Sequence, residues 1–118
     1  MVSPARQIAF NVLRRVVEGG YASDILLKQS APLDSRDAGL ASEIVFGCLR
    51  YQAQLDHLIS RFATGPLDPE VRIALRMGIY QLRHLDRVPA HAAVGESVEL
   101  VKRGPRRSAS GLDRKSVV

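Results

Sequence analysis

A helix–turn–helix pattern in residues 73–102 constrains the fold more than any other feature of this sequence. Apolar residues recur at spacings of three and four positions before and after the turn, which places one apolar stripe along each of two helices. The members of the two stripes are Val71, Leu75, Gly78, Leu82 and Leu85, then Ala90, Ala93, Val94, Val98 and Val101. Asp68 and Pro69 are typical of a helix start. Pro89 forces Val88 out of helical geometry, so the first helix is expected to end near Leu85.

The remainder of the chain has the same helical periodicity, and no stretch alternates with the period of two that is typical of strands. The additional helical segments that we expect are residues 4–17, 21–29 and 36–62. Ser3 and Ser35 are the expected caps of the first and third segments. The apolar stripe of the third segment weakens at residues 50–54, which predicts a kink or a break into two helices. The fold class is therefore all-α, a bundle with short loops.

Length and composition indicate one domain without a metal or a membrane anchor. The 118 residues suffice for one domain with its own core and are too few for two ordinary ones. The single cysteine, Cys48, excludes an internal disulfide, and its apolar helical surroundings predict a buried small residue. The histidines are too scattered for a metal site, and around the Pro89 turn we expect His84 and His91 to join a capping and salt-bridge network. No apolar run could span a bilayer and no signal-peptide core is present, so we expect a cytoplasmic protein with no membrane partner.

The formal net charge of +5 is concentrated at one end of the chain. Residues 1–101 carry 11 Lys/Arg and 11 Asp/Glu, whereas residues 102–118 carry six basic residues and one acidic residue. Any electrostatic attraction to RNA must therefore come from local basic patches or from the C-terminal tail.

Several segments together resemble the NusB-type RNA-binding domain. They are residues 3–6, 20–27, 36–50 and 75–82, followed by Arg-Val-Pro-Ala-His-Ala-Ala-Val at 87–94 and Glu-Ser-Val-Glu-Leu-Val-Lys at 96–102. The copy that this sequence most resembles is the domain that precedes the catalytic domain in RsmB/Sun-type 16S rRNA cytosine-5 methyltransferases. The resemblance covers about residues 2–102 and implies a NusB-like helical bundle that binds RNA.

The C-terminal segment departs from this resemblance, because members of the family continue into a last helix. We divide the chain into a helical domain at residues 1–103 and an irregular basic tail at residues 104–118. Residues 113–118 resemble one reading frame of a common sequencing adapter, so we expect a truncated read from residue 113; the alternative is a natural basic tail. A truncated bundle would lack its last helix and expose the apolar face meant for that helix.

Catalytic chemistry is not expected from this chain. The resemblance implies a methyltransferase that binds S-adenosylmethionine on a doubly wound sheet and uses a cysteine nucleophile. This sequence has no βαβ pattern, no glycine-rich cofactor loop and no second cysteine, and Cys48 lies in neither a Pro-Cys nor a Thr-Cys context. We therefore expect no catalytic residue and no cofactor here. S-adenosylmethionine would belong to the missing domain, so the chain is not an enzyme by itself.

RNA binding is the function with a physical basis in the sequence. The candidate contact residues are Arg6, Arg14, Arg15 and Arg36. The first three lie on the first helix, which has no acidic residue before Glu18, and Arg36 is expected to join the same face. Their contacts would be mostly to phosphate, which positions RNA without reading its sequence. The tyrosines that could stack on bases are Tyr21, Tyr51 and Tyr80, of which Tyr80 is expected to be buried.

Three functions remain open at this point. The first is an RNA-recognition domain that positions rRNA for a methyltransferase domain attached in cis. The second is a free-standing NusB-type transcription antitermination factor that binds nascent RNA together with a ribosomal protein. The third is a helical protein-interaction domain whose arginines only keep it soluble. Residues 20–23, 47–50 and 80–82 favour the first, and the oligomeric state is left open.

Overall fold

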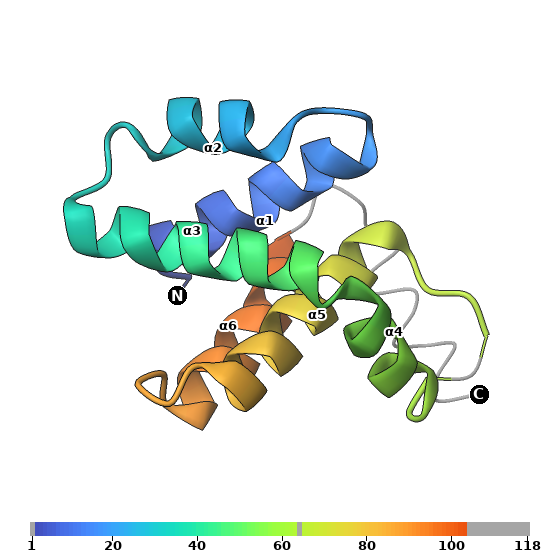
Figure 1. The fold of residues 1–118 in the computed structure, drawn as a ribbon. Coiled ribbons are helices and arrows are strands. Elements are labelled where there is room, and N and C mark those ends of the chain that lie inside the picture. The colour runs from blue at the N-terminus through green and yellow to red at the C-terminus, as the bar shows by residue number, and fades with distance from the viewer. Residues whose placement is uncertain (1, 64, 104–118) are drawn as a thin grey trace.

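The structure, a computed structural model, describes residues 2–63 and 65–103, and within these ranges it consists of six helices and no strand (Figure 1). The helices are α1 (Pro4–Val17), α2 (Ala22–Ser30), α3 (Ser35–Arg50), α4 (Gln52–Ser60), α5 (Pro69–His84) and α6 (Ala90–Arg103). The all-α class is thereby confirmed. The tail predicted at residues 104–118, with its expected truncation from residue 113, lies outside the described residues and stays a prediction.

The helix boundaries follow local backbone signals. The predicted break in the third segment lies at Tyr51, which ends α3 and precedes α4 with non-helical dihedral angles (φ −103°, ψ 19°). The cap of α3 is Asp34, whose carboxylate accepts a hydrogen bond from the Asp37 N–H at 2.8 Å. The prediction of Ser35 as the cap was therefore wrong by one residue, because aspartate and serine cap equally well. Ser3 holds the cap position of α1, but its side chain makes no capping bond.

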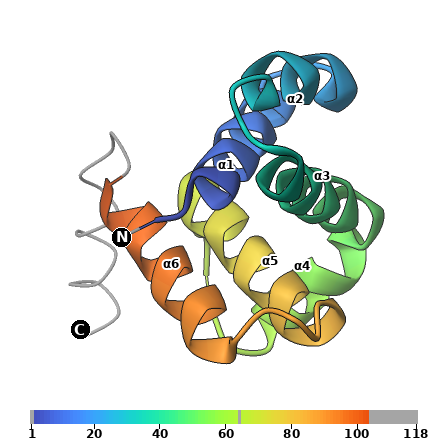
Figure 2. The same ribbon diagram turned by 90° about the vertical axis from the view of Figure 1, so that its left-hand side faces the viewer.

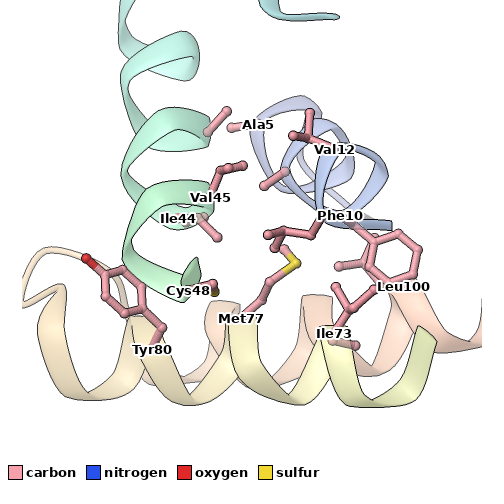
Figure 3. Packing of buried hydrophobic residues seen from close by; sticks show 14 of the residues in the cluster. Ala5, Phe10, Val12, Ile44, Val45, Cys48, Ile73, Met77, Tyr80 and Leu100 are labelled. Atoms are coloured by element: carbon pink, nitrogen blue, oxygen red, sulfur yellow. The ribbon is translucent and has the colours of Figure 1, made fainter. Parts of the chain in front are cut away.

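The helices form two groups that share one core. The first group is α1, α2 and α3, and the second is α4, α5 and α6; α1 and α3 lie against α5 (Figures 1 and 2). The core between the groups is apolar and includes the fully buried side chains of Val12, Ile44, Val45 and Met77 (Figure 3). Leu55 of α4 is fully buried in the same core. Since α5 packs against α1, α3, α4 and α6, its side chains connect the two groups.

Small residues allow α5 and α6 to approach closely, among them alanines at the start of the apolar stripe of α6. Gly78 of α5 faces α6, and a Cβ atom at this position would lie 2.8 Å from the Ser97 hydroxyl oxygen. Ala93, one turn before Ser97, is completely buried. A larger side chain at Gly78 would therefore push the two helices apart.

An acidic residue on α4 holds this helix against α5. Asp56 accepts hydrogen bonds from Arg76 Nε at 2.8 Å and from Arg76 Nη2 at 2.9 Å, and Arg72 Nη1 adds a third at 3.2 Å. The hydrogen bonds from Arg76, together with the positive charges of both arginines, lower the pKa of Asp56. The carboxylate form is thus favoured by the folded protein.

Replacing Asp56 by asparagine should destabilise the protein at pH 7 by up to about 1 kcal/mol, because the side chain is only partly shielded from solvent. A carboxyl group whose pKa is lower in the folded than in the unfolded state stabilises the protein at pH values above its unfolded-state pKa. This stabilisation is lost as the pH falls through the folded-state pKa. The free energies of unfolding in urea of the wild type and Asp56→Asn should therefore differ at pH 7, and this difference should shrink below about pH 4. Glu43→Gln, at an exposed position on α3, is the control. A difference that does not change with pH would contradict the role of the charge.

Candidate nucleic-acid interface

Arg6, the first predicted RNA contact, is buried inside the bundle with 7% of its surface exposed. Its Nε donates to Gln81 Oε1 at 2.7 Å, and its Nη1 donates to Glu96 Oε2 at 2.9 Å and to Ser3 Oγ at 3.1 Å. The Ser3 N–H donates to the other oxygen of Glu96 at 2.6 Å. This network ties the start of α1 to α5 and α6. Arg6 is thus engaged by the protein itself and leaves little surface for RNA, and its predicted RNA contact stays a prediction.

Arg14 is partly engaged by the protein itself. Its Nη1 lies 3.2 Å from Glu70 Oε2, and its guanidinium group lies 5.7 Å from the centre of the Phe10 ring. About a third of the side chain stays exposed. A phosphate could reach Arg14, but it would compete with Glu70 for the guanidinium group.

Arg15 and Arg36 are exposed, as an RNA contact requires, but they do not share one face. The helices α1 and α3 run side by side in the same direction (Figure 1). Arg15 lies in the last turn of α1, whereas Arg36 lies at the start of α3, so the two residues are at opposite ends of the helix pair. The structure therefore does not gather the four arginines on one exposed face.

Three aromatic rings stack on one another where the end of α3 meets α5: one from the α3–α4 junction and two from α5. Sequence reasoning did not find this cluster. The ring centres of Tyr51 and His84 lie 4.5 Å apart with an interplanar angle of 16°, and those of Tyr80 and His84 lie 4.9 Å apart at 22°. Tyr51 and Tyr80 are 6.2 Å apart at 27°. The spacing of four residues between Tyr80 and His84 was a readable signal. The position of Tyr51 next to these two rings, in contrast, depends on how α3 crosses α5.

The rings differ in their exposure. Tyr80 is buried as predicted, Tyr51 is half-buried and His84 is exposed. Burial raises the pKa of Tyr80, and the charge of Glu43 adds to this effect, so its hydroxyl group stays protonated at neutral pH. The expected capping and salt-bridge network at the Pro89 turn is not what positions His84, whose contacts are the two tyrosine rings.

Gly47 of α3 makes room for the stack. A Cβ atom at Gly47 would overlap Cζ and Oη of Tyr80, so the tyrosine ring lies directly against the backbone of α3. Cys48, the next residue, is buried, which confirms the prediction that it is a small core residue. Burial raises the pKa of its thiol to about 12, so the thiolate form that a nucleophile requires is not populated at neutral pH.

The two apolar stripes of α5 and α6 line an open groove on the surface. The groove has a volume of about 170 Å³ and is walled by Val71, Ala74, Leu75, Gly78, Ile79, Leu82, Val94, Ser97, Val98 and Val101. Leu82, Val94 and Val98 are each about half exposed. The stripes therefore pack against each other along their inner edges, while their outer edges are not covered by any described residue.

Residues 2–63 and 65–103 show neither a metal site nor a membrane-spanning helix. No group of three or more His, Cys, Asp or Glu side chains in these ranges is placed to hold a metal ion. None of the helices described there is long and apolar enough to cross a bilayer. The surface features that the described part of the chain offers are exposed arginines, an aromatic stack and an apolar groove, which are features of a binding domain.

Comparison with known sequences agrees with this class and identifies the family. The chain belongs to the NusB family, whose sequence profile matches residues 3–112. No solved structure gives a significant match.

Curated relatives of the chain are named as rRNA methyltransferases. It is 38% identical to a probable ribosomal RNA small subunit methyltransferase B of Synechocystis over 83% of this chain and 23% of that protein. The ribosomal RNA small subunit methyltransferase B of Vibrio vulnificus is 39% identical over 86% of this chain and 25% of its own length. The probable enzyme of Bacillus subtilis is 34% identical over 89% of this chain and 25% of its own. The chain thus spans about a quarter of the length of these relatives.

Proposed function

We propose that this chain is the RNA-binding domain that positions rRNA for a cytosine-5 methyltransferase domain joined to it in the full-length protein. The observation that carries the proposal is the match of a NusB-family sequence to about a quarter of several proteins named ribosomal RNA small subunit methyltransferase B. These relatives favour the methyltransferase role over the free-standing antitermination factor. We place the protein in the cytoplasm, where rRNA is modified in bacteria such as those relatives.

The chain itself is proposed to have no methyltransferase activity. Its described residues form helices rather than the doubly wound sheet on which S-adenosylmethionine would bind. Its cysteine is held as a protonated thiol in the core, which does not suit a nucleophile that attacks a cytosine ring. S-adenosylmethionine and the catalytic cysteine would both be supplied by the remainder of the full-length protein.

The proposed RNA contacts on the helical body are Arg15 and Arg36, with Arg14 as a weaker contributor. Arg15 and Arg36 are both exposed, and the described residues give neither of them an ion-pair partner. Because they lie at opposite ends of the α1–α3 pair, they would contact phosphates that are well separated along the RNA. Such contacts hold and orient a structured RNA but do not select a sequence.

Removing both arginines should weaken binding to a 16S rRNA fragment and flatten its salt dependence. Each lost phosphate contact should lower the slope of log affinity against log salt by about 0.7–0.9. The measurement is a salt titration of RNA affinity for the wild type and for Arg15→Ala/Arg36→Ala. The control is Lys28→Ala/Lys102→Ala, which removes the same charge from exposed positions on α2 and α6.

The outcomes separate an RNA-binding domain from a protein-interaction domain. A slope that falls for both double variants by the same amount would assign the effect to net charge and remove Arg15 and Arg36 from the interface. Absence of RNA binding by the wild type at low salt would overturn RNA binding and favour a protein-interaction domain.

A further inference from the structure

We propose that the ring stack of Tyr51, His84 and Tyr80 is a platform on which an unpaired RNA base stacks, with Arg50 and Arg83 holding the flanking phosphates. This inference rests on the proposed function, since it assumes that the chain binds RNA. It adds a site where the C-terminal ends of α3 and α5 meet, built from residues other than the four arginines predicted from the sequence.

The geometry of the rings suits the stacking of a base. Tyr51 and His84 are stacked face to face, with ring centres 4.5 Å apart and an interplanar angle of 16°, so the stack offers a base the face of the exposed His84 ring that the tyrosines do not cover. His84 is exposed and Tyr51 is half-buried, which leaves part of this surface open to solvent. Tyr80, which is buried, stacks on His84 at 4.9 Å and fixes the orientation of the platform from below. A preformed rigid platform loses little conformational entropy when a base stacks on it.

The charges next to the platform suit a nucleic-acid strand. Arg50 immediately precedes Tyr51 at the end of α3, and Arg83 immediately precedes His84 in the last turn of α5. Both arginines are exposed, and the described residues pair neither of them with a carboxylate. Burial and the charge of Glu43 raise the pKa of the Tyr80 hydroxyl group, and the charge of Arg50 lowers it.

The C-termini of α3 and α5 do not attract a phosphate at this place, because the helix dipole is negative there. We therefore assign the attraction to the two guanidinium groups, and their removal is a direct test.

The ligand that this arrangement fits is a single-stranded or looped segment of RNA. In a duplex the bases are stacked on one another and their faces are not accessible, whereas bases in loops and bulges can stack on aromatic side chains. Stacking of this kind tolerates all four bases, because each has a π-face. The platform is thus expected to prefer unpaired RNA over duplex RNA without reading its sequence.

The experiment uses the 118-residue chain and a single-stranded RNA oligonucleotide that contains 2-aminopurine, whose fluorescence is quenched when it stacks. We expect quenching on binding, and about a tenfold loss of affinity for both Tyr51→Ala and His84→Ala. Tyr51→Phe and His84→Tyr keep a ring at each position and should retain affinity within about twofold. Arg50→Ala/Arg83→Ala should lower affinity and the salt slope while leaving the rings in place.

The matched control is Tyr21→Ala, which removes a tyrosine that is 78% exposed and lies outside the stack. Circular dichroism of each variant establishes that it is folded before its affinity is compared. RNA binding by the wild type with no quenching, or with equal losses for Tyr21→Ala and Tyr51→Ala, would overturn the platform and leave the proposed function standing. Absence of RNA binding by the wild type would overturn both. Equal affinity for the oligonucleotide and its duplex would overturn the preference for unpaired bases.

Discussion

Replacing Glu96 by alanine should destabilise the fold by about 3 kcal/mol, because it leaves the buried guanidinium group of Arg6 without its carboxylate. The Arg6 and Glu96 side chains are only 8% and 16% exposed, so water cannot replace the lost partner well. The Ser3 N–H would also lose its acceptor. A loss of this size is a large share of the 5–15 kcal/mol by which domains of ordinary stability are folded.

The measurement is chemical unfolding of the wild type and of Glu96→Ala, monitored by circular dichroism. Glu99→Ala removes a carboxylate three residues further along α6, and we expect a cost below about 0.5 kcal/mol there. The double variant Arg6→Met/Glu96→Ala should lose less than the sum of its single variants, since no unpaired charge is left in the core. Additive losses, or equal losses for Glu96→Ala and Glu99→Ala, would show that the ion pair contributes little.

Replacing Gly47 by alanine should cost about 2 kcal/mol, although alanine is the better helix former by nearly 1 kcal/mol. The added methyl group would overlap the end of the Tyr80 ring, and this ring is held by its stacking on His84 and Tyr51. Either α3 moves away from α5 or Tyr80 leaves its position, and both changes disturb the core.

Gly39 provides the control within the same helix. A Cβ atom at Gly39 would meet no atom within 4 Å, so Gly39→Ala should stabilise the protein by up to about 1 kcal/mol. The two substitutions are chemically identical and should change the midpoint of urea unfolding in opposite directions. Adding Tyr80→Leu should reduce the cost of Gly47→Ala, because a shorter side chain removes the overlap. A stabilising effect of Gly47→Ala would mean that α3 and α5 are not in close contact.

Much of the secondary structure could be predicted because its signals act over a few residues. Pro4 and Pro69 begin α1 and α5, and Pro89 separates α5 from α6. The break at Tyr51 was visible as a weakened apolar stripe. The cap of α3 was missed by one residue, since Asp34 and Ser35 are neighbours with equal capping ability.

The candidate sites were harder to predict, because their partners are distant in the sequence. Arg6, Arg14 and Arg15 look alike on an isolated helix, yet Arg6 faces Gln81 and Glu96 across 75 and 90 positions of the chain. The aromatic platform likewise needs Tyr51 to meet His84, which no local spacing indicates.

Local chemistry in the sequence thus determines where the helices begin and end, that the class is all-α, and which family the chain resembles. Caps, prolines and helical periodicity act within about four residues, so they can be read without knowing the fold. The angles at which the helices cross then determine which arginine is buried in an ion pair, which arginines stay free for a phosphate, and which rings stack. These contacts depend on side-chain packing between helices that are far apart in the chain, and that packing is a property of the whole bundle.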